Sequence, residues 1–146
     1  MKIVVCGPEG SGTRALKVNV ERLCGPEHEV RHLSLPLGDE WWRPSDVDGE
    51  RVVVITRRPD VQAQCAFRQG CAPSPAVAAE EWPRAINTLA QIPVAYWVLY
   101  EALVAAPMTQ LLGVMDWLGV EADWNRLIED QWWPIRDENA KYGVPT

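Results

Sequence analysis

The sequence predicts an α/β domain in which helices cover both faces of a parallel sheet. Short apolar runs such as residues 51–56 alternate with segments of helical periodicity, and this order requires repeated strand–helix–strand crossovers. The chain has 146 residues, a length that fits one domain spanning residues 1–146. We therefore expect three layers built on a sheet of about four or five strands.

The first part of the chain predicts two strands and a helix. Residues 3–6 are a continuous apolar run, which is typical of a buried parallel strand. From residue 13 to about residue 23 the apolar residues recur at helical spacing, and a Gly-Pro pair then ends the helix. Residues 28–35 predict a second strand, and residues 37–50 predict a loop.

The middle of the chain predicts one strand followed by two helices. Residues 51–56 are almost entirely β-branched, as strands prefer. Pro59 occupies the first position of a helix. Ser74 and Pro75 form an N-cap and first-position pair for a further helix, which Pro83 is expected to split or kink.

The last part of the chain predicts one more strand and two helices. Residues 94–100 predict the strand. Pro107 begins a helix of regular apolar spacing that Gly119 ends. Residues 123–133 predict a short final helix, and the remaining tail is expected to be irregular.

Composition excludes several classes of protein. The net charge of −6 at pH 7 disfavours a general nucleic-acid or anionic-membrane surface. No apolar run approaches the roughly 20 residues of a membrane helix, and the apolar part of the N-terminus is too short for a signal peptide. The four cysteines show no CxxC spacing, so we expect reduced thiols, a cytoplasmic protein and no metal site.

A glycine-rich loop lies between the first strand and the first helix, where phosphate-binding loops belong. Residues 7–14 read GPEGSGTR, and glycines allow successive backbone N–H groups to turn toward one anion. The frame matches the loop of nucleotide triphosphatases, but Thr13 stands where that motif has lysine and Arg14 where it has Ser or Thr. These two departures disfavour a P-loop kinase, although such a kinase is kept as one alternative function.

Four stretches together resemble the sulfotransferase superfamily. Residues 7–16, GPEGSGTRAL, are similar to the 5′-phosphosulfate loop of the heparan-type enzymes. Residues 55–61 resemble the strand end whose arginine binds the 3′-phosphate, and residues 100–119 resemble a family stretch whose tyrosine lies near the adenine. Residues 32–36 and 137–142 look like segments of short phage-type proteins of this kind.

The resemblance implies a P-loop-like fold and a nucleotide cofactor, 3′-phosphoadenosine 5′-phosphosulfate (PAPS), with adenosine 3′,5′-bisphosphate (PAP) as its product. Two positions depart from the family pattern: Gly10 replaces a lysine, and Cys65 replaces a serine that follows the 3′-phosphate arginine. The cofactor site that the resemblance implies comprises Gly7, Gly10, Ser11, Gly12, Thr13, Arg14, Arg57, Cys65, Tyr100 and Lys141.

Sulfuryl transfer resembles phosphoryl transfer, so the protein must neutralise developing charge and accept a proton from the acceptor. Arg14 and Lys17 are the candidates for the first task, and His32 is the candidate general base. Asp39 and Glu40, in the loop after the second strand, are alternatives to His32.

Tryptophan is in excess, with eight residues against three Tyr and one Phe. Trp82, Trp97 and Trp117 occupy periodic positions and are expected to fill the core. Each of the adjacent pairs 41–42 and 132–133 should place one ring at a surface, a pocket or an interface. Such a ring could line an acceptor site or join two copies of the chain, or it could pack a loop on the sheet.

The leading hypothesis is a sulfotransferase-like protein that binds PAPS and transfers a sulfuryl group to an unidentified hydroxyl or amine acceptor. If phage-encoded, it would work in the cytoplasm of a bacterial host. A small P-loop nucleotide or small-molecule kinase is one alternative. A catalytically degenerate binding or assembly module with the same fold is the other, because of the departures at Gly10 and Cys65.

Overall fold

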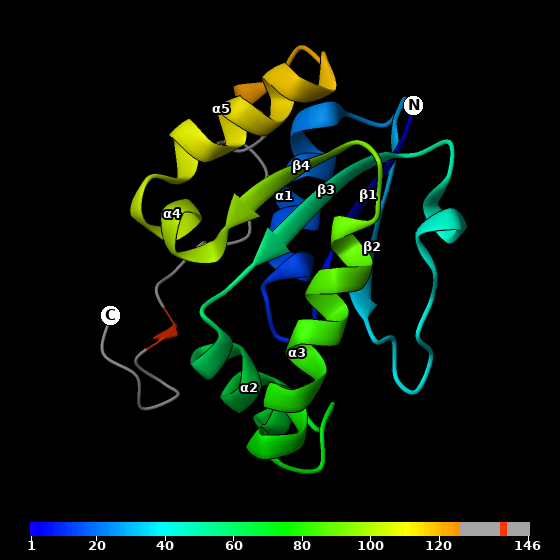
Figure 1. Cartoon of the computed structure of the whole chain (residues 1–146). Coiled ribbons are helices and arrows are strands. Elements are labelled where there is room, and N and C mark those ends of the chain that lie inside the picture. Colours follow the sequence, from blue (N-terminus) through cyan, green and yellow to red (C-terminus); the bar gives the residue numbers. More distant parts are fainter. Residues whose placement is uncertain (126–137, 140–146) are drawn as a thin grey trace.

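Four parallel strands form one sheet in the order β2-β1-β3-β4 (Figure 1). The structure is a computed structural model, and it describes residues 1–125 and 138–139. The strands are β1 (Lys2–Pro8), β2 (Glu29–Leu35), β3 (Arg51–Thr56) and β4 (Ala95–Leu99). The sequence-based prediction of a parallel α/β sheet is confirmed.

Helices cover both faces of the sheet, as predicted (Figure 1). They are α1 (Thr13–Cys24), α2 (Pro59–Arg68), α3 (Pro75–Ala90), α4 (Tyr100–Ala105) and α5 (Pro107–Leu118). Helices α1 and α5 pack on one face and α3 on the other. Among the described residues, no helix has both the length and the apolar character needed to cross a membrane.

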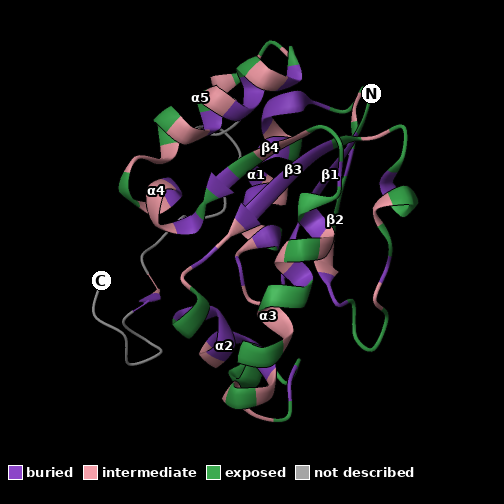
Figure 2. Ribbon diagram, in the orientation of Figure 1, coloured by how far each residue is buried: buried purple, intermediate pink, exposed green. Residues whose placement is uncertain are grey.

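The core lies on both sides of the central strand β1 (Figure 2). Ile3 and Val5 point into the cluster formed with α1 and α5, whereas Val4 and Cys6 point into the cluster under α3. All four side chains are fully buried. This double burial explains why the strand is apolar without alternation.

Three local features differ from the sequence-based expectations. The predicted strand 94–100 ends at Leu99, and Tyr100 instead begins the unpredicted short helix α4. The predicted loop 37–50 contains a 3₁₀ helix, η1 (Pro44–Val47). Pro83 does not split α3, which is one helix with this proline inside it.

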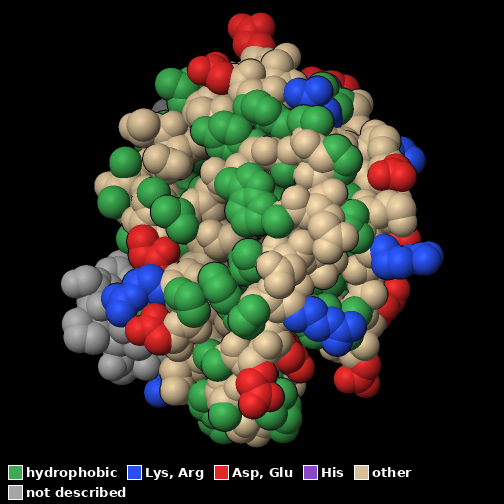
Figure 3. All heavy atoms as spheres, viewed as in Figure 1, with side chains coloured by type: hydrophobic (Ala, Val, Ile, Leu, Met, Phe, Trp, Pro, Cys, Tyr) green, Lys and Arg blue, Asp and Glu red, His purple; other side chains and the backbone are tan. Residues whose placement is uncertain are grey.

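One tryptophan differs from expectation, and one pair separates. In the pair 41–42, Trp42 is buried and its indole Nε1 donates a hydrogen bond to the carbonyl oxygen of Ser34 at 2.8 Å, whereas Trp41 is half-buried. Trp97 was expected in the core but is 44% exposed, because β4 is an edge strand. It lines an apolar groove between β4 and α3 together with Leu99. Figure 3 shows hydrophobic side chains gathered on the face that β4 and α3 form.

The predicted helix 123–133 and the tryptophan pair 132–133 fall largely or wholly outside the described residues. The remaining periodic tryptophans are half-buried: Trp117 packs against the core cluster of α1 and α5, and Trp82 lines the groove beside Trp97.

Candidate anion-binding site

The glycine loop lies at the carboxyl edge of the sheet, between β1 and α1, as predicted. Gly12 has φ 90° and is the N-cap of α1, and no side chain caps this helix. The N–H groups of an uncapped first turn, together with the helix dipole, favour an anion at this position. Gly7 is buried at the end of β1, where a Cβ would collide with the carbonyl oxygen of Ile55.

Two hydroxyl groups add to this loop. Ser11 is fully buried, and among the described residues its Oγ has no hydrogen-bond partner. Thr13, which is 9% exposed, begins α1. A buried hydroxyl without a partner is uncommon in a folded protein. The loop therefore fits a phosphate or sulfate group that would accept a hydrogen bond from Ser11.

Arg57 brings a buried positive charge to the loop from the end of β3. Its side chain is almost fully enclosed, with 4% of the residue exposed. Nη1 donates a hydrogen bond to the carbonyl oxygen of Gly10 at 3.1 Å, and Nε donates to Oδ1 of Asn139 at 2.9 Å. A guanidinium held in this way can also make charge-assisted bonds to a phosphate.

The Tyr100 ring contacts both Arg57 and the glycine loop. The guanidinium carbon of Arg57 is 4.0 Å from the ring centroid, a cation–π contact. A Cβ at Gly12 would lie 3.0 Å from Cδ2 of Tyr100. The structure thus brings together Gly10, Gly12, Arg57 and Tyr100, four of the residues that the sequence placed at the site.

Helix α2 explains the glycine at position 10. A Cβ there would lie 3.1 Å from the Cβ of Cys65, from the backbone nitrogen of Ala66 and from the carbonyl oxygen of Gln62. A longer side chain with ordinary backbone geometry would therefore meet α2. Cys65, predicted as a cofactor ligand, is 2% exposed and packs beside this glycine.

The three residues assigned to catalysis lie together on the α1 side of the sheet. His32 is on β2 beside Val5. Roughly 10 Å of strand separates it from Leu35, the last residue of β2 at the carboxyl end of the sheet. Burial, and then the positive charges of Lys17 and Arg14, lower the pKa of His32. The lowered pKa favours the neutral imidazole, which can accept a proton, but His32 is exposed and lies on the far side of β1 from Arg57.

The other candidates are less closely tied to the loop. Lys17 forms an ion pair with Glu21. Glu21 lies one helical turn after Lys17 and therefore further from the glycine loop. Asp39 and Glu40 are exposed in the turn after β2. Lys141 lies outside the described residues.

Two residues at the site were missed from the sequence. Asn139 is 2% exposed and bonds to Arg57 and, through Nδ2, to Oε1 of Glu101 at 3.3 Å. It lies in the stretch 137–142 that carries part of the resemblance, but only Lys141 of that stretch was predicted at the site. Glu9 could have been found from the sequence, because an acidic residue is unexpected inside a loop that binds anions.

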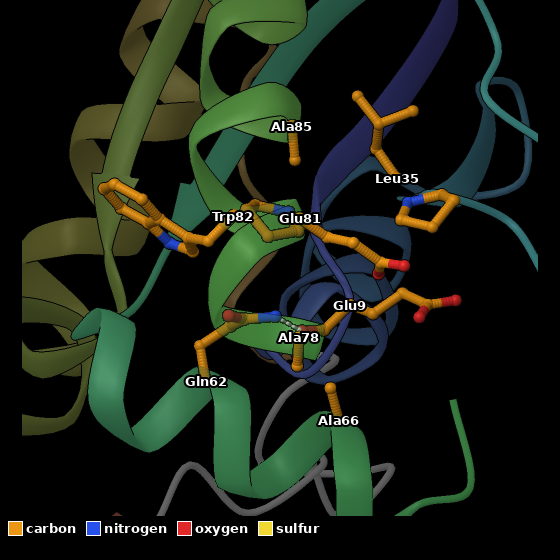
Figure 4. A pocket seen from close by; sticks show the side chains of 10 residues that line it. Glu9, Leu35, Gln62, Ala66, Ala78, Glu81, Trp82 and Ala85 are labelled. Carbon is orange, nitrogen blue, oxygen red and sulfur yellow. Dashed lines mark hydrogen bonds between the residues drawn. The ribbon is translucent and has the colours of Figure 1, made fainter. Parts of the chain in front are cut away.

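Glu9 is buried, with 6% exposed, and faces a pocket on the α3 side of the loop (Figure 4). Burial, and then the negative charge of Glu81, raise the pKa of Glu9 to about 7, while a hydrogen bond from the backbone of Gly38 opposes the rise. The side-chain amide of Gln62 donates a hydrogen bond to the carbonyl oxygen of Glu9.

A parallel sheet whose first strand passes through a glycine loop into a helix N-terminus defines the P-loop-like class of α/β proteins. Among solved structures, the fold is similar to that of mouse sulfotransferase SULT7A1 complexed with PAP, with a TM-score of 0.64 and 16% sequence identity. The match covers 88% of this chain and 61% of the mouse chain, so this chain spans less than two thirds of that protein. The sulfotransferase fold expected from the sequence is confirmed. No protein-family model matches the sequence, and no curated protein sequence matches it.

Proposed function

We propose that this protein binds PAPS at the glycine loop and transfers its sulfuryl group to a hydroxyl or amine acceptor. The observation that carries the proposal is Arg57, a buried cation from β3 that contacts the loop carbonyl of Gly10. It does so within a fold shared with a sulfotransferase complexed with PAP.

The residues around the loop suit the two ends of such a nucleotide. Ser11, Thr13 and Arg14, with the first-turn N–H groups of α1, would hold the 5′ end. Arg57 would bind the 3′-phosphate, and Tyr100 offers a ring beside it for the adenine. PAPS, when bound, supplies an activated sulfuryl group, and the site needs no metal ion to hold it.

His32 is the general base of this proposal, because its lowered pKa favours the neutral imidazole, the form that accepts a proton. Arg14 and Lys17 are the nearby cations. Asp39 and Glu40 remain the alternative bases. From the sequence resemblance we also infer a relation to short phage-type proteins and a small-molecule or glycan-like acceptor. From the cysteine spacing we infer a cytoplasmic setting, and from the adjacent tryptophan pairs we infer contacts between copies of the chain.

Calorimetric titration with PAP, and separately with ATP and magnesium, tests nucleotide binding. We expect the wild type to bind PAP and not ATP. In Arg57→Lys the charge remains but the guanidinium geometry is lost, so PAP affinity should fall about 10- to 100-fold. Arg58→Ala is the matched control, because this neighbouring side chain is partly exposed and pairs with Asp60.

Circular dichroism and urea unfolding show whether Arg57→Lys retains the fold. Equal PAP affinity in the wild type and Arg57→Lys would remove Arg57 from the site, and binding of ATP with magnesium in preference to PAP would favour the kinase alternative. If PAP binds, transfer of radiolabelled sulfate with His32→Asn as the variant tests catalysis. Unchanged turnover would exclude His32 as the base, and binding without transfer would favour a degenerate binding module.

A further inference from the structure

Residues 138 and 139 reach the anion-binding site from far along the chain (red in Figure 1). Asn139 is 2% exposed, and its Oδ1 accepts the 2.9 Å hydrogen bond from Nε of Arg57, a residue 82 positions earlier. The backbone nitrogen of Glu138 donates to the hydroxyl of Tyr100, the ring over which the guanidinium of Arg57 lies. Two adjacent residues therefore contact both the buried cation of the site and its aromatic neighbour.

The side-chain amide of Asn139 has one orientation that satisfies both of these neighbours. Its Oδ1 faces the guanidinium of Arg57, and its Nδ2 donates to Oε1 of Glu101 at 3.3 Å. A guanidinium can only donate hydrogen bonds, whereas an ionised carboxylate can only accept them. The opposite orientation would place donor against donor and acceptor against acceptor. Arg57 and Glu101 therefore determine which way this amide faces.

Glu101 is itself held beside the end of β3. Its Oε1 also accepts a hydrogen bond from the backbone nitrogen of Arg58 at 2.9 Å. One carboxylate oxygen therefore binds both the main chain directly after Arg57 and the amide that holds the Arg57 side chain. Glu101, Asn139 and Arg57 form a chain of hydrogen bonds in which each side chain orients the next.

These contacts fix the plane of the Arg57 guanidinium. Nε is bonded to Asn139 and Nη1 to the carbonyl oxygen of Gly10 at 3.1 Å, so two nitrogens of one rigid, planar group are held by two separate segments. The central carbon of the group lies 4.0 Å from the centroid of the Tyr100 ring. A guanidinium that is oriented before its ligand arrives loses less conformational entropy on binding.

The chemical identity of residue 139 matters because both of these acceptors are neutral. The carbonyl oxygen of Gly10 and the amide oxygen of Asn139 orient the guanidinium without adding a negative charge beside it. A carboxylate at position 139 would pair more strongly with Arg57. It would also repel Glu101 and any phosphate that approaches Arg57, since like charges at short range disfavour one another.

We propose that Asn139 is a positioning residue for the 3′-phosphate of the nucleotide: its amide, oriented by Glu101, holds Arg57 ready to bind this group without adding negative charge to the site. The inference rests on the proposed function, in which Arg57 binds the 3′-phosphate, and it adds a residue that acts through Arg57. Residue 139 should therefore control how well the protein distinguishes PAP from adenosine 5′-monophosphate (AMP), which lacks the 3′-phosphate.

Calorimetric titration with PAP and with AMP tests this role. Asn139→Asp keeps the side-chain shape and adds one negative charge, so it should lower PAP affinity about 10- to 100-fold and change AMP affinity by less than about threefold. Asn139→Ala removes the bond to Arg57 without adding charge and should lower PAP affinity about 3- to 10-fold. Asn87→Asp, which adds the same charge at an exposed position of α3, is the control and should bind both nucleotides like the wild type.

Equal losses of PAP and AMP affinity in Asn139→Asp would show a general structural role, and unchanged PAP affinity in both Asn139 variants would show no role. Either result would overturn the proposal.

A second readout needs no nucleotide. In ¹⁵N-labelled protein, the Nε–H signal of Arg57, assigned by its loss in Arg57→Lys, should exchange with solvent at least about 5-fold faster in Asn139→Ala than in the wild type. An unchanged exchange rate would overturn the proposal whatever the nucleotides do. Failure of the wild type to bind PAP, together with faster exchange in Asn139→Ala, would count against the proposed function and not against the hold of Asn139 on Arg57.

Discussion

At the scale of single residues, the Tyr100 ring organises the anion-binding site. The guanidinium of Arg57 lies over the ring, and the ring edge lies against Gly12. Its hydroxyl accepts a hydrogen bond from the backbone nitrogen of Glu138 at 3.3 Å. One aromatic side chain therefore connects the loop after β1, the end of β3 and a segment near the C-terminus.

The contact at Gly12 gives a prediction about stability. Gly12→Ala combines a left-handed backbone with a Cβ 3.0 Å from Tyr100, and we expect it to lower the free energy of unfolding by about 2–4 kcal/mol. Gly49→Ala has a similar φ of 81° but open space around it, so it should cost about 1–2 kcal/mol. Urea unfolding measures both, and equal losses would show that Tyr100 does not constrain the loop.

Glu9 gives a prediction about pH. Its folded pKa of about 7 exceeds the ordinary value of 4.5, so between these values the folded protein binds more protons than the unfolded chain. The protonated carboxyl is therefore the form that suits the folded protein. Its contribution to the free energy of unfolding is complete below pH 4.5 and is lost as the pH rises through 7. A glutamine at position 9 does not ionise. The free energy of unfolding of Glu9→Gln should therefore increase relative to that of the wild type as the pH rises from 4.5 to 7.

Urea unfolding from pH 4 to pH 8 measures the difference between Glu9→Gln and the wild type. The exposed Glu80→Gln should show no such trend. A difference between Glu9→Gln and the wild type that stays constant with pH would mean that Glu9 titrates normally in the folded protein.

At the scale of elements, the connection from β2 to β3 is anchored by one ring. Trp42 packs into the cluster under α3 and donates its indole hydrogen bond to Ser34, whereas Trp41 is half-buried beneath Arg84. The connection returns to the sheet without a long helix of its own. Burial of this ring therefore supplies the packing that a crossover helix would give.

Trp42→Phe tests this anchor. The variant leaves the carbonyl oxygen of Ser34 without its 2.8 Å partner and leaves space in a packed cluster, so the free energy of unfolding should fall by about 1–3 kcal/mol. Trp41→Phe keeps a ring under Arg84 and should cost less than about 1 kcal/mol. A larger loss in Trp41→Phe would reverse the assignment of the anchor.

The elements were predictable where local chemistry decides them. The β-branched run of β3 and the cap of α3, where Ser74 Oγ accepts from the backbone nitrogen of Val77 at 3.2 Å, follow from a few adjacent residues. The glycine loop was predictable for the same reason. Burial of Trp42 and the approach of Asn139 to Arg57 depend on contacts between distant parts of the chain, which periodicity does not encode.

At the scale of the whole molecule, the two edges of the sheet differ in character. The edge strand β2 exposes charged side chains such as Glu29 and Arg31, which disfavour pairing with another chain. The edge strand β4 exposes Trp97 and Leu99 instead, at 44% and 57%. The β4 edge is therefore the expected starting point of aggregation when the protein is heated.

Trp97→Lys should reduce light scattering on heating. Since more than half of this residue is buried in the groove, the variant should also lower the free energy of unfolding by about 1–3 kcal/mol. Leu112→Lys is the control: this residue is 47% exposed but lies on α5, away from a sheet edge. An equal reduction of scattering in Leu112→Lys would assign the effect to charge alone.

The parallel sheet also determines when, during synthesis of the chain, its strands can pair. The central strand β1 is made first on the ribosome, yet Lys2 pairs with Glu29 and Ile3 pairs with Arg51. Neither pair of strands can form from a local hairpin. In each case a long loop of chain must close, at a cost in entropy, before the strands can form hydrogen bonds. The nascent strand β1 must therefore remain unpaired until β2 has left the exit tunnel, and its second edge stays open until β3 follows. This is the interval in which a chaperone would have its greatest effect on yield.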